Sequence, residues 1–160
     1  FSDADLTSKL ETLLSHSRIL PGTLELEITE SVIMDKGEAA IGRLEELKAL
    51  GVKLFVDDFG TGYSSLSYLH RFPIDMLKID RSFIREIDAT GGHAEIVRAI
   101  VGLGRNLGLE LIAEGVETDA QLAVIRTLGC QYAQGYLFSK PCPAAAIEEY
   151  LAREKTQGQT

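Results

Sequence analysis

Short strand-like segments recur along this chain, and a helix-like segment follows most of them. Residues 24–29 alternate strictly between apolar and polar side chains, which is the two-residue period of a strand. The expected strands are 24–29, 52–56, 76–79, 109–113 and 132–138. The expected helices are 3–14 with Ser2 or Asp3 as its cap, one starting near Ser64, 37–50, 95–107, 119–128 and 143–152. Alternating strands and helices predict an α/β fold with a parallel sheet.

Composition and charge exclude several classes of protein. The 160 residues carry a net charge of −8, which disfavours binding to the backbone of DNA or RNA. No apolar run approaches the roughly 20 residues of a membrane span, so we expect no membrane contact by this segment. The two cysteines, Cys130 and Cys142, are too few for a disulfide framework, and three scattered histidines do not suggest a zinc site.

Ionisable and polar side chains stand at the ends of successive expected strands. These residues are Glu27 and Glu30, Asp57 and Asp58, Lys78 and Asp80, Glu114 and Glu117, and Gln134 within the last strand. The carboxyl ends of parallel strands meet at one face of the fold, where active sites of α/β proteins lie. We therefore expect these side chains to converge in space.

Several carboxylates around a single lysine leave an excess of negative charge that needs a cation. Hard oxygen ligands favour Mg²⁺ or Mn²⁺, and Lys78 alone cannot balance four acidic neighbours. The alternative is structural, because a lone acidic residue after a strand is usually a helix cap or a solvated charge. Recurrence at four strand ends favours the functional interpretation.

A glycine-containing loop follows Asp57. Residues 58–65 read Asp-Phe-Gly-Thr-Gly-Tyr-Ser-Ser, and the two glycines permit positive φ angles and close backbone approach. The loop lacks the spacing and the lysine of a P-loop. It is interpreted either as a tight turn or as a mobile active-site loop connected to a metal through Asp58, and the two interpretations are compatible.

Five linked motifs resemble the EAL domain, a family that includes cyclic di-GMP phosphodiesterases of bacterial signalling. They are Glu27-Ile28-Thr29-Glu30, residues 57–62 (Asp-Asp-Phe-Gly-Thr-Gly), Lys78-Ile79-Asp80, residues 113–117 (Ala-Glu-Gly-Val-Glu) and Gln134-Gly135-Tyr136. The resemblance extends from about residue 1 to residue 151. It implies a TIM-barrel-like (β/α)8 variant, here incomplete with about five strands. It also implies hydrolysis of cyclic di-GMP to linear pGpG with two metal ions, Mg²⁺ or Mn²⁺.

The resemblance implies a role for each matching residue. Glu27 and Asp57 resemble ligands of the metal core, and Asp58 resembles a ligand of the second metal. Lys78 resembles the residue that holds the attacking water or the phosphate, and Glu114 the general base. Glu30 resembles a glutamate that anchors the loop after Asp58. The remaining matches, Asp80, Glu117 and Gln134, belong to the periphery of the site.

Two ligands that the resemblance implies are absent from this sequence. It contains no Glu-Ala-Leu segment, and its only asparagine, Asn106, falls in an expected helix. Residues 1–160 are therefore interpreted as a partial EAL domain that lacks the N-terminal strands and the Glu-Ala-Leu motif. The retained site residues favour an active parent domain and an inactive isolated fragment. The alternatives are a naturally shortened, inactive module that binds cyclic di-GMP or a protein partner, and another magnesium-dependent barrel enzyme.

Further expectations come from the resemblance alone. Members of this family often form homodimers near the loop and helix after Asp58, and they often follow a sensory or cyclase domain. We accordingly expect a cytoplasmic bacterial domain, in a parent protein that other segments could anchor to a membrane.

Overall fold

Five parallel strands form one sheet in this computed structural model, which describes residues 5–62, 66–87 and 92–157. The strands are β1 (Glu25–Thr29), β2 (Lys53–Phe59), β3 (Met76–Ile79), β4 (Glu110–Glu114) and β5 (Tyr132–Gln134). Their order in the sheet is β1-β2-β3-β4-β5, and every neighbouring pair is parallel. The predicted α/β class and parallel sheet are therefore confirmed.

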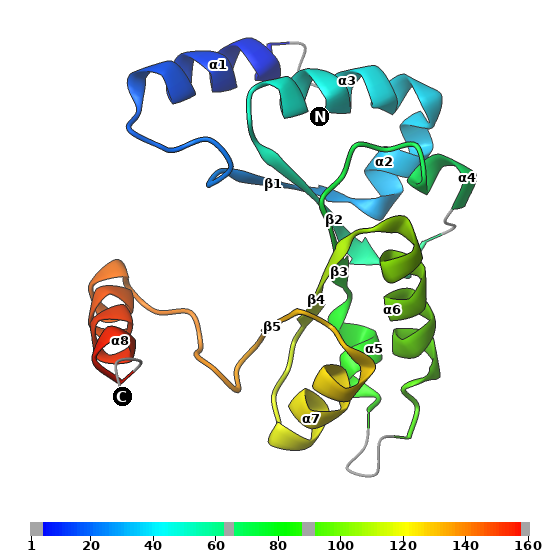
Figure 1. The fold of residues 1–160 in the computed structure, drawn as a ribbon, viewed down its shortest axis with the longest axis vertical. Coiled ribbons are helices and arrows are strands. Elements are labelled where there is room, and N and C mark those ends of the chain that lie inside the picture. Colours follow the sequence, from blue (N-terminus) through cyan, green and yellow to red (C-terminus); the bar gives the residue numbers. More distant parts are fainter. Residues whose placement is uncertain (1–4, 63–65, 88–91, 158–160) are drawn as a thin grey trace.

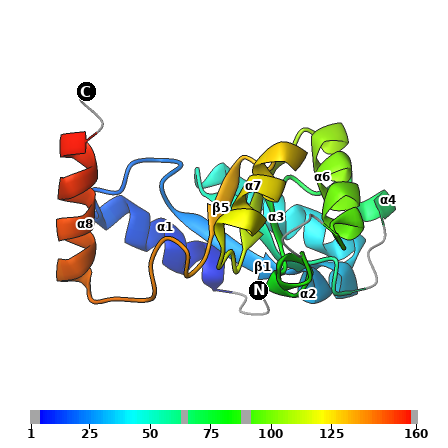
Figure 2. The same cartoon turned by 90° about the horizontal axis from the view of Figure 1, so that it is seen from below.

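One helix precedes β1, and helices follow each of the five strands. The first is α1 (Leu6–His16), and the others are α2 (Glu30–Lys36), α3 (Glu38–Ala49), α4 (Leu66–Leu69), α5 (Arg81–Arg85), α6 (Glu95–Leu107), α7 (Asp119–Leu128) and α8 (Ala144–Gln157). The sheet runs through the middle of Figure 1 with α2, α3, α5, α6 and α7 around it, whereas α8 stands apart. Figure 2 shows the same separation of α8 from a second direction. None of the described helices combines the length and apolar character needed to cross a bilayer.

The two faces of the sheet differ in chemistry. Alternate side chains of the strands, such as Val56, Leu77 and Leu111, are fully buried against the helices and form the core. The other face carries the intervening residues, which include Glu27, Lys78 and other polar side chains. This segregation follows from the two-residue period of the strands. The prediction of an apolar face under the helices is confirmed, whereas the opposite face, called the polar face below, is only partly polar, because it also carries Phe55, Met76 and Ile112.

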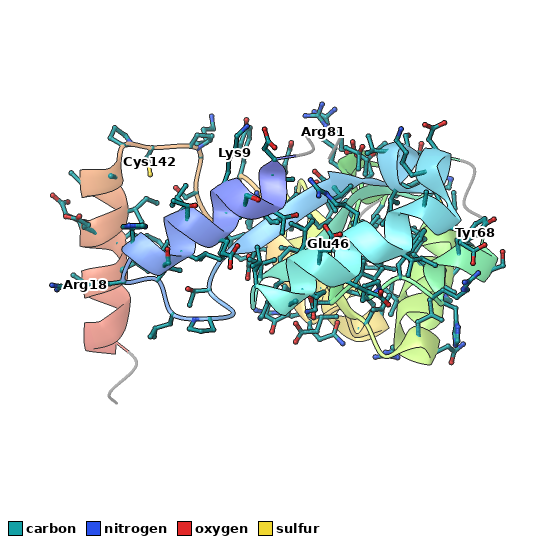
Figure 3. The ribbon with its side chains drawn as sticks, turned by 90° about the horizontal axis from the view of Figure 1, so that it is seen from above. Lys9, Arg18, Glu46, Tyr68, Arg81 and Cys142 are labelled. Atoms are coloured by element: carbon teal, nitrogen blue, oxygen red, sulfur yellow. The ribbon has the colours of Figure 1, made fainter. Side chains whose placement is uncertain are left out.

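A cavity of about 980 Å³ lies along the polar face. Residues near the beginnings of the strands, among them Lys53, Met76 and Glu110, line one side of it. The segment after β5 and Ile147 of α8 line the other side. Figure 3 shows Cys142 on the extended segment that leads into α8. The sheet is thus open on this side, as an incomplete barrel would be.

Several predicted boundaries need correction. The expected strand 132–138 ends at Gln134, because the chain turns at Gly135, whose carbonyl accepts hydrogen bonds from the backbone nitrogens of Phe138 and Ser139. The short helices α2 and α5 were not predicted. The proposed caps Ser2 and Asp3 and the helix start near Ser64 lie outside the described residues, and the described part of that helix begins at Leu66.

Candidate active site

The ammonium group of Lys78 is the centre of the candidate site. Its Nζ atom lies 2.7 Å from Glu27 Oε1, 2.7 Å from Glu114 Oε1 and 3.2 Å from Asp57 Oδ1. These carboxylates come from β1, β4 and β2, while Lys78 belongs to β3. The predicted convergence of strand-end side chains is therefore confirmed for these four residues.

Burial and charge set the protonation of this cluster. Burial would lower the pKa of Lys78, but its contacts with Glu114, Glu27 and Asp57 outweigh burial and raise that pKa above the usual value. Burial raises the pKa of Glu114, the carboxylates of Asp57 and Glu27 raise it further, and Lys78 opposes them. Lys78 thus stays charged, and Glu114 binds a proton more readily than an ordinary glutamate.

Asp58 lies next to the cluster but takes no part in the ion pairs of Lys78. Its φ of 55° is in the left-handed region, which is rare for residues other than glycine, and its backbone nitrogen donates to Asp57 Oδ1 at 2.9 Å. Partial burial, Asp57 and Asp80 raise the pKa of the Asp58 carboxyl group. Such backbone strain persists where surrounding contacts impose it and is frequent at functional sites.

Glu30 connects the first helix after β1 to the loop after β2. Its side chain is 1% exposed, and Oε2 accepts a hydrogen bond from the backbone nitrogen of Gly60 at 2.7 Å. A side chain at Gly62 would crowd the same carboxylate, at 3.2 Å from Oε1. The contact is the one expected of a loop-anchoring glutamate. Residues 63–65 of the predicted loop lie outside the described residues.

The three peripheral residues lie around the cluster rather than in it. Asp80 caps α5 by accepting from the backbone nitrogen of Ser82 at 2.9 Å, and its hydrogen bonds outweigh burial and lower its pKa. Glu117 lies 4.0 Å from Arg85, and Gln134 pairs with Glu114 across β4 and β5. Sequence reasoning missed Gln121, a buried side chain that holds the loop after β4. The Thr118-Asp119-Ala120-Gln121 capping pattern was the available signal.

The donor chemistry of the cluster fits a hard divalent cation, whereas the arrangement of the donors is not a ready metal cage. The carboxylates of Glu27, Asp57 and Glu114 carry three negative charges against the single positive charge of Lys78. Within residues 5–62, 66–87 and 92–157, no three or more His, Cys, Asp or Glu side chains are grouped to hold a metal. Lys78 Nζ takes the central place between the carboxylates.

Comparisons with known proteins agree with the motifs. The chain is 49% identical over 148 residues to the cyclic di-GMP phosphodiesterase NbdA of Pseudomonas aeruginosa, covering 92% of this chain and 19% of NbdA. It is 48% identical to the bifunctional diguanylate cyclase/cyclic di-GMP phosphodiesterase MucR of the same species, covering 92% of this chain and 22% of MucR. The chain thus spans about a fifth of the length of these relatives.

Solved structures share the fold. The MucR phosphodiesterase in complex with c-di-GMP superimposes with a TM-score of 0.86 at 47% identity, over 91% of this chain and 59% of that one. A manganese/cy-diGMP complex of Klebsiella pneumoniae BlrP1 gives a TM-score of 0.77 at 34% identity, over 88% and 36% of the two chains. Residues 1–141 match the family model described as the EAL domain, and the chain therefore belongs to the EAL domain family.

Proposed function

We propose that the domain containing this chain hydrolyses cyclic di-GMP to linear pGpG. The observation that carries the proposal is the meeting of Glu27, Asp57, Lys78 and Glu114 at the ends of four adjacent parallel strands. Membership of the EAL family supports the choice of substrate, because two relatives in that family are named for cyclic di-GMP phosphodiesterase activity.

Glu114 and Lys78 have the catalytic roles in this proposal. Hydrolysis adds one water across one phosphorus–oxygen bond, so a base must accept a proton from the water while the ribose oxygen leaves and takes up a proton. Glu114 suits the base, because its partial burial and raised pKa increase its affinity for a proton. Lys78, held charged by its carboxylate neighbours, provides a fixed positive charge for the phosphate oxygens as negative charge develops.

Glu27, Asp57 and Asp58 are the proposed ligands for divalent metal, with Mg²⁺ and Mn²⁺ as the candidates and two ions in the complete site. The bound metal would supply positive charge for the phosphate and acidify the attacking water. Glu30 keeps the start of the loop after β2 in place through its hydrogen bond with the backbone nitrogen of Gly60. Asp80, Glu117 and Gln134 have a supporting role around these ligands in this proposal, and the ion pairs of Lys78 are with Glu27, Asp57 and Glu114 instead.

We also propose that residues 1–160 form the C-terminal part of an EAL domain, whose N-terminal strands supply the remaining ligands. The open polar face of the sheet supports this, as does the coverage of only 59% of the MucR structure. The homodimer, the upstream sensory or cyclase domain and the cytoplasmic location stay predictions.

Turnover of cyclic di-GMP tests the proposed function. The full-length protein that carries this chain should convert cyclic di-GMP to pGpG with Mg²⁺ or Mn²⁺, and EDTA should abolish the reaction; chromatography of the nucleotides measures both. Binding of cyclic di-GMP without turnover under either metal would instead support a signalling module that binds and does not hydrolyse. Lys78 pairs with the carboxylates of Glu27, Asp57 and Glu114, which occupies proposed metal ligands. This observation favours the second candidate.

A further inference from the structure

Gln121 is a buried polar side chain outside the five motifs. It belongs to the first turn of α7 and is 7% exposed. Its Oε1 atom accepts from the backbone nitrogens of Glu117 and Thr118, at 2.9 and 3.1 Å. Its Nε2 atom donates to the backbone carbonyl of Ile84 at 3.2 Å. Because an unpaired buried amide would destabilise the fold, these three hydrogen bonds hold the side chain in one orientation.

The contacts of Gln121 join two segments that leave neighbouring strands. Glu117 and Thr118 belong to the loop that follows β4, whereas Ile84 belongs to α5, which follows β3. The two strands carry Glu114 and Lys78, whose charged groups are 2.7 Å apart. Gln121 therefore connects the loop after β4 to α5, the two segments that follow the residues of this ion pair.

The loop after β4 is confined on its other sides as well. Gly115 has a φ of 72°, and a Cβ atom there would lie 2.6 Å from Cβ of Arg81, the first residue of α5. Opposite, the backbone of Val116 donates to the carbonyl of Gln134 and accepts from the nitrogen of Leu137, both at 3.0 Å. The loop thus contacts α5 directly at its first residue, and Gln121 adds a second attachment near the last.

We infer that Gln121 is a positioning residue, which holds Glu114 at its working distance from Lys78 by bracing the loop after β4 against α5. The inference rests on the proposed role of Glu114 in the hydrolysis. A base must lie within hydrogen-bond reach of its proton, and small displacements reduce turnover strongly. The side chain of Gln121 bonds backbone groups of the loop and of α5 rather than Lys78, so we expect its removal to impair the chemical step more than substrate binding.

Gln131, an exposed glutamine beside the same strand, provides a control. Its Oε1 atom accepts from the backbone nitrogen of Leu111 at 3.1 Å, near the beginning of β4 and away from Glu114. Gln131→Met thus removes an acceptor for a backbone N–H of β4, and Gln121→Met removes an acceptor for backbone N–H groups just after β4. In the full-length protein, Gln121→Met should lower kcat roughly 10- to 100-fold and change KM less than about threefold. Gln131→Met should leave kcat unchanged.

Hydrogen exchange supplies a measurement that does not depend on the proposed activity. Gln121→Met should accelerate exchange at the amides of Glu117 and Thr118, and Gln131→Met should not. If Gln121→Met does not fold, Gln121→Glu keeps the two accepted hydrogen bonds and removes the donor to Ile84, and it should show an intermediate loss of kcat. Equal kcat in the two methionine variants, or unchanged exchange, overturns the inference. Absence of turnover in the wild type overturns the proposed function. The hydrogen-exchange rates of Glu117 and Thr118 still test whether Gln121 holds the loop after β4.

Discussion

Glu30 Oε2 lies 2.7 Å from the backbone nitrogen of Gly60, and it connects the helix after β1 to the loop after β2. The two residues are thirty positions apart in the sequence, and the glutamate is almost completely buried. A buried carboxylate needs hydrogen-bond donors, and the loop backbone provides one. The conformation of the loop beside Asp58 therefore depends on a residue of a different strand–helix unit.

Replacement of Glu30 by alanine should weaken both the fold and the use of metal. Gly60 would lose a buried acceptor, so we expect the free energy of unfolding to fall by about 1–3 kcal/mol in urea titrations. The metal concentration for half-maximal turnover should rise roughly 10- to 100-fold, because the loop beside Asp58 loses its support. Glu45→Ala, at an exposed position of α3, is the control. A normal metal requirement in the destabilised variant would mean that Glu30 has only a structural role.

Replacement of Glu114 by glutamine should separate binding from turnover. The variant keeps the shape of the side chain but loses the base, so kcat should fall by about 100-fold or more. The dissociation constant for cyclic di-GMP, measured by calorimetry, should stay within about threefold of the wild-type value. Glu110→Gln changes a glutamate at the other end of β4, where it accepts from the Tyr132 hydroxyl at 3.1 Å, and should retain turnover. Full activity in Glu114→Gln would refute the proposed role.

Two glycines of α6 should respond oppositely to alanine. A Cβ atom at Gly104 would lie 2.8 Å from Leu111 Cδ2 of the buried core, whereas one at Gly102 would meet nothing within 4 Å. Gly102→Ala should stabilise the protein by up to about 1 kcal/mol through helix propensity, and Gly104→Ala should destabilise it by about 1–3 kcal/mol through overpacking. Thermal unfolding of the two variants measures this, and equal shifts would contradict the packing of α6 on β4.

The two thiols should differ in reactivity. Burial raises the pKa of Cys130, which also donates through Sγ to the carbonyl of Leu111 at 3.3 Å, whereas Cys142 is exposed. Thiolate is the reactive form, and a raised pKa leaves less of it at pH 8. Native protein should therefore show one fast and one slow thiol with a disulfide reagent, and the slow reaction should accelerate as pH rises. In Cys142→Ser the fast phase should disappear; its persistence would show that Cys130 is accessible.

Much of the fold is predictable where two local signals coincide. The helices 95–107 and 119–128 have the predicted bounds, because apolar periodicity and a following glycine mark the same end. The helices α2 and α5 are too short for such periodicity, at seven and five residues. The error in β5 is tertiary in origin, because a Cβ atom at Gly135 would lie 2.2 Å from the carbonyl oxygen of Val116. The close approach of the Gly135 and Val116 backbones ends the pairing of β5 with β4, so the aromatic residues after Gly135 lie outside the sheet.

The candidate site was predictable as a place but not in its detailed arrangement. Parallel strands bring their carboxyl ends together, so the meeting of Glu27, Asp57 and Glu114 follows from the order of the strands. The central position of Lys78 Nζ between them depends on the stagger of β3 against its neighbours, which local sequence does not encode. Gln121 was missed because its hydrogen-bond partners are backbone groups, so the capping pattern from Thr118 to Gln121 is the signal that it leaves in the sequence.

The strand order β1-β2-β3-β4-β5 also has a consequence for how the chain folds. Each strand pairs with the strand synthesised just before it, so no pairing waits for a distant part of the sequence. The paired residues of neighbouring strands are 20 to 34 positions apart in the sequence, so each new pairing closes only one strand–helix unit. During translation the sheet can grow by one strand at a time as each β–α unit leaves the ribosome.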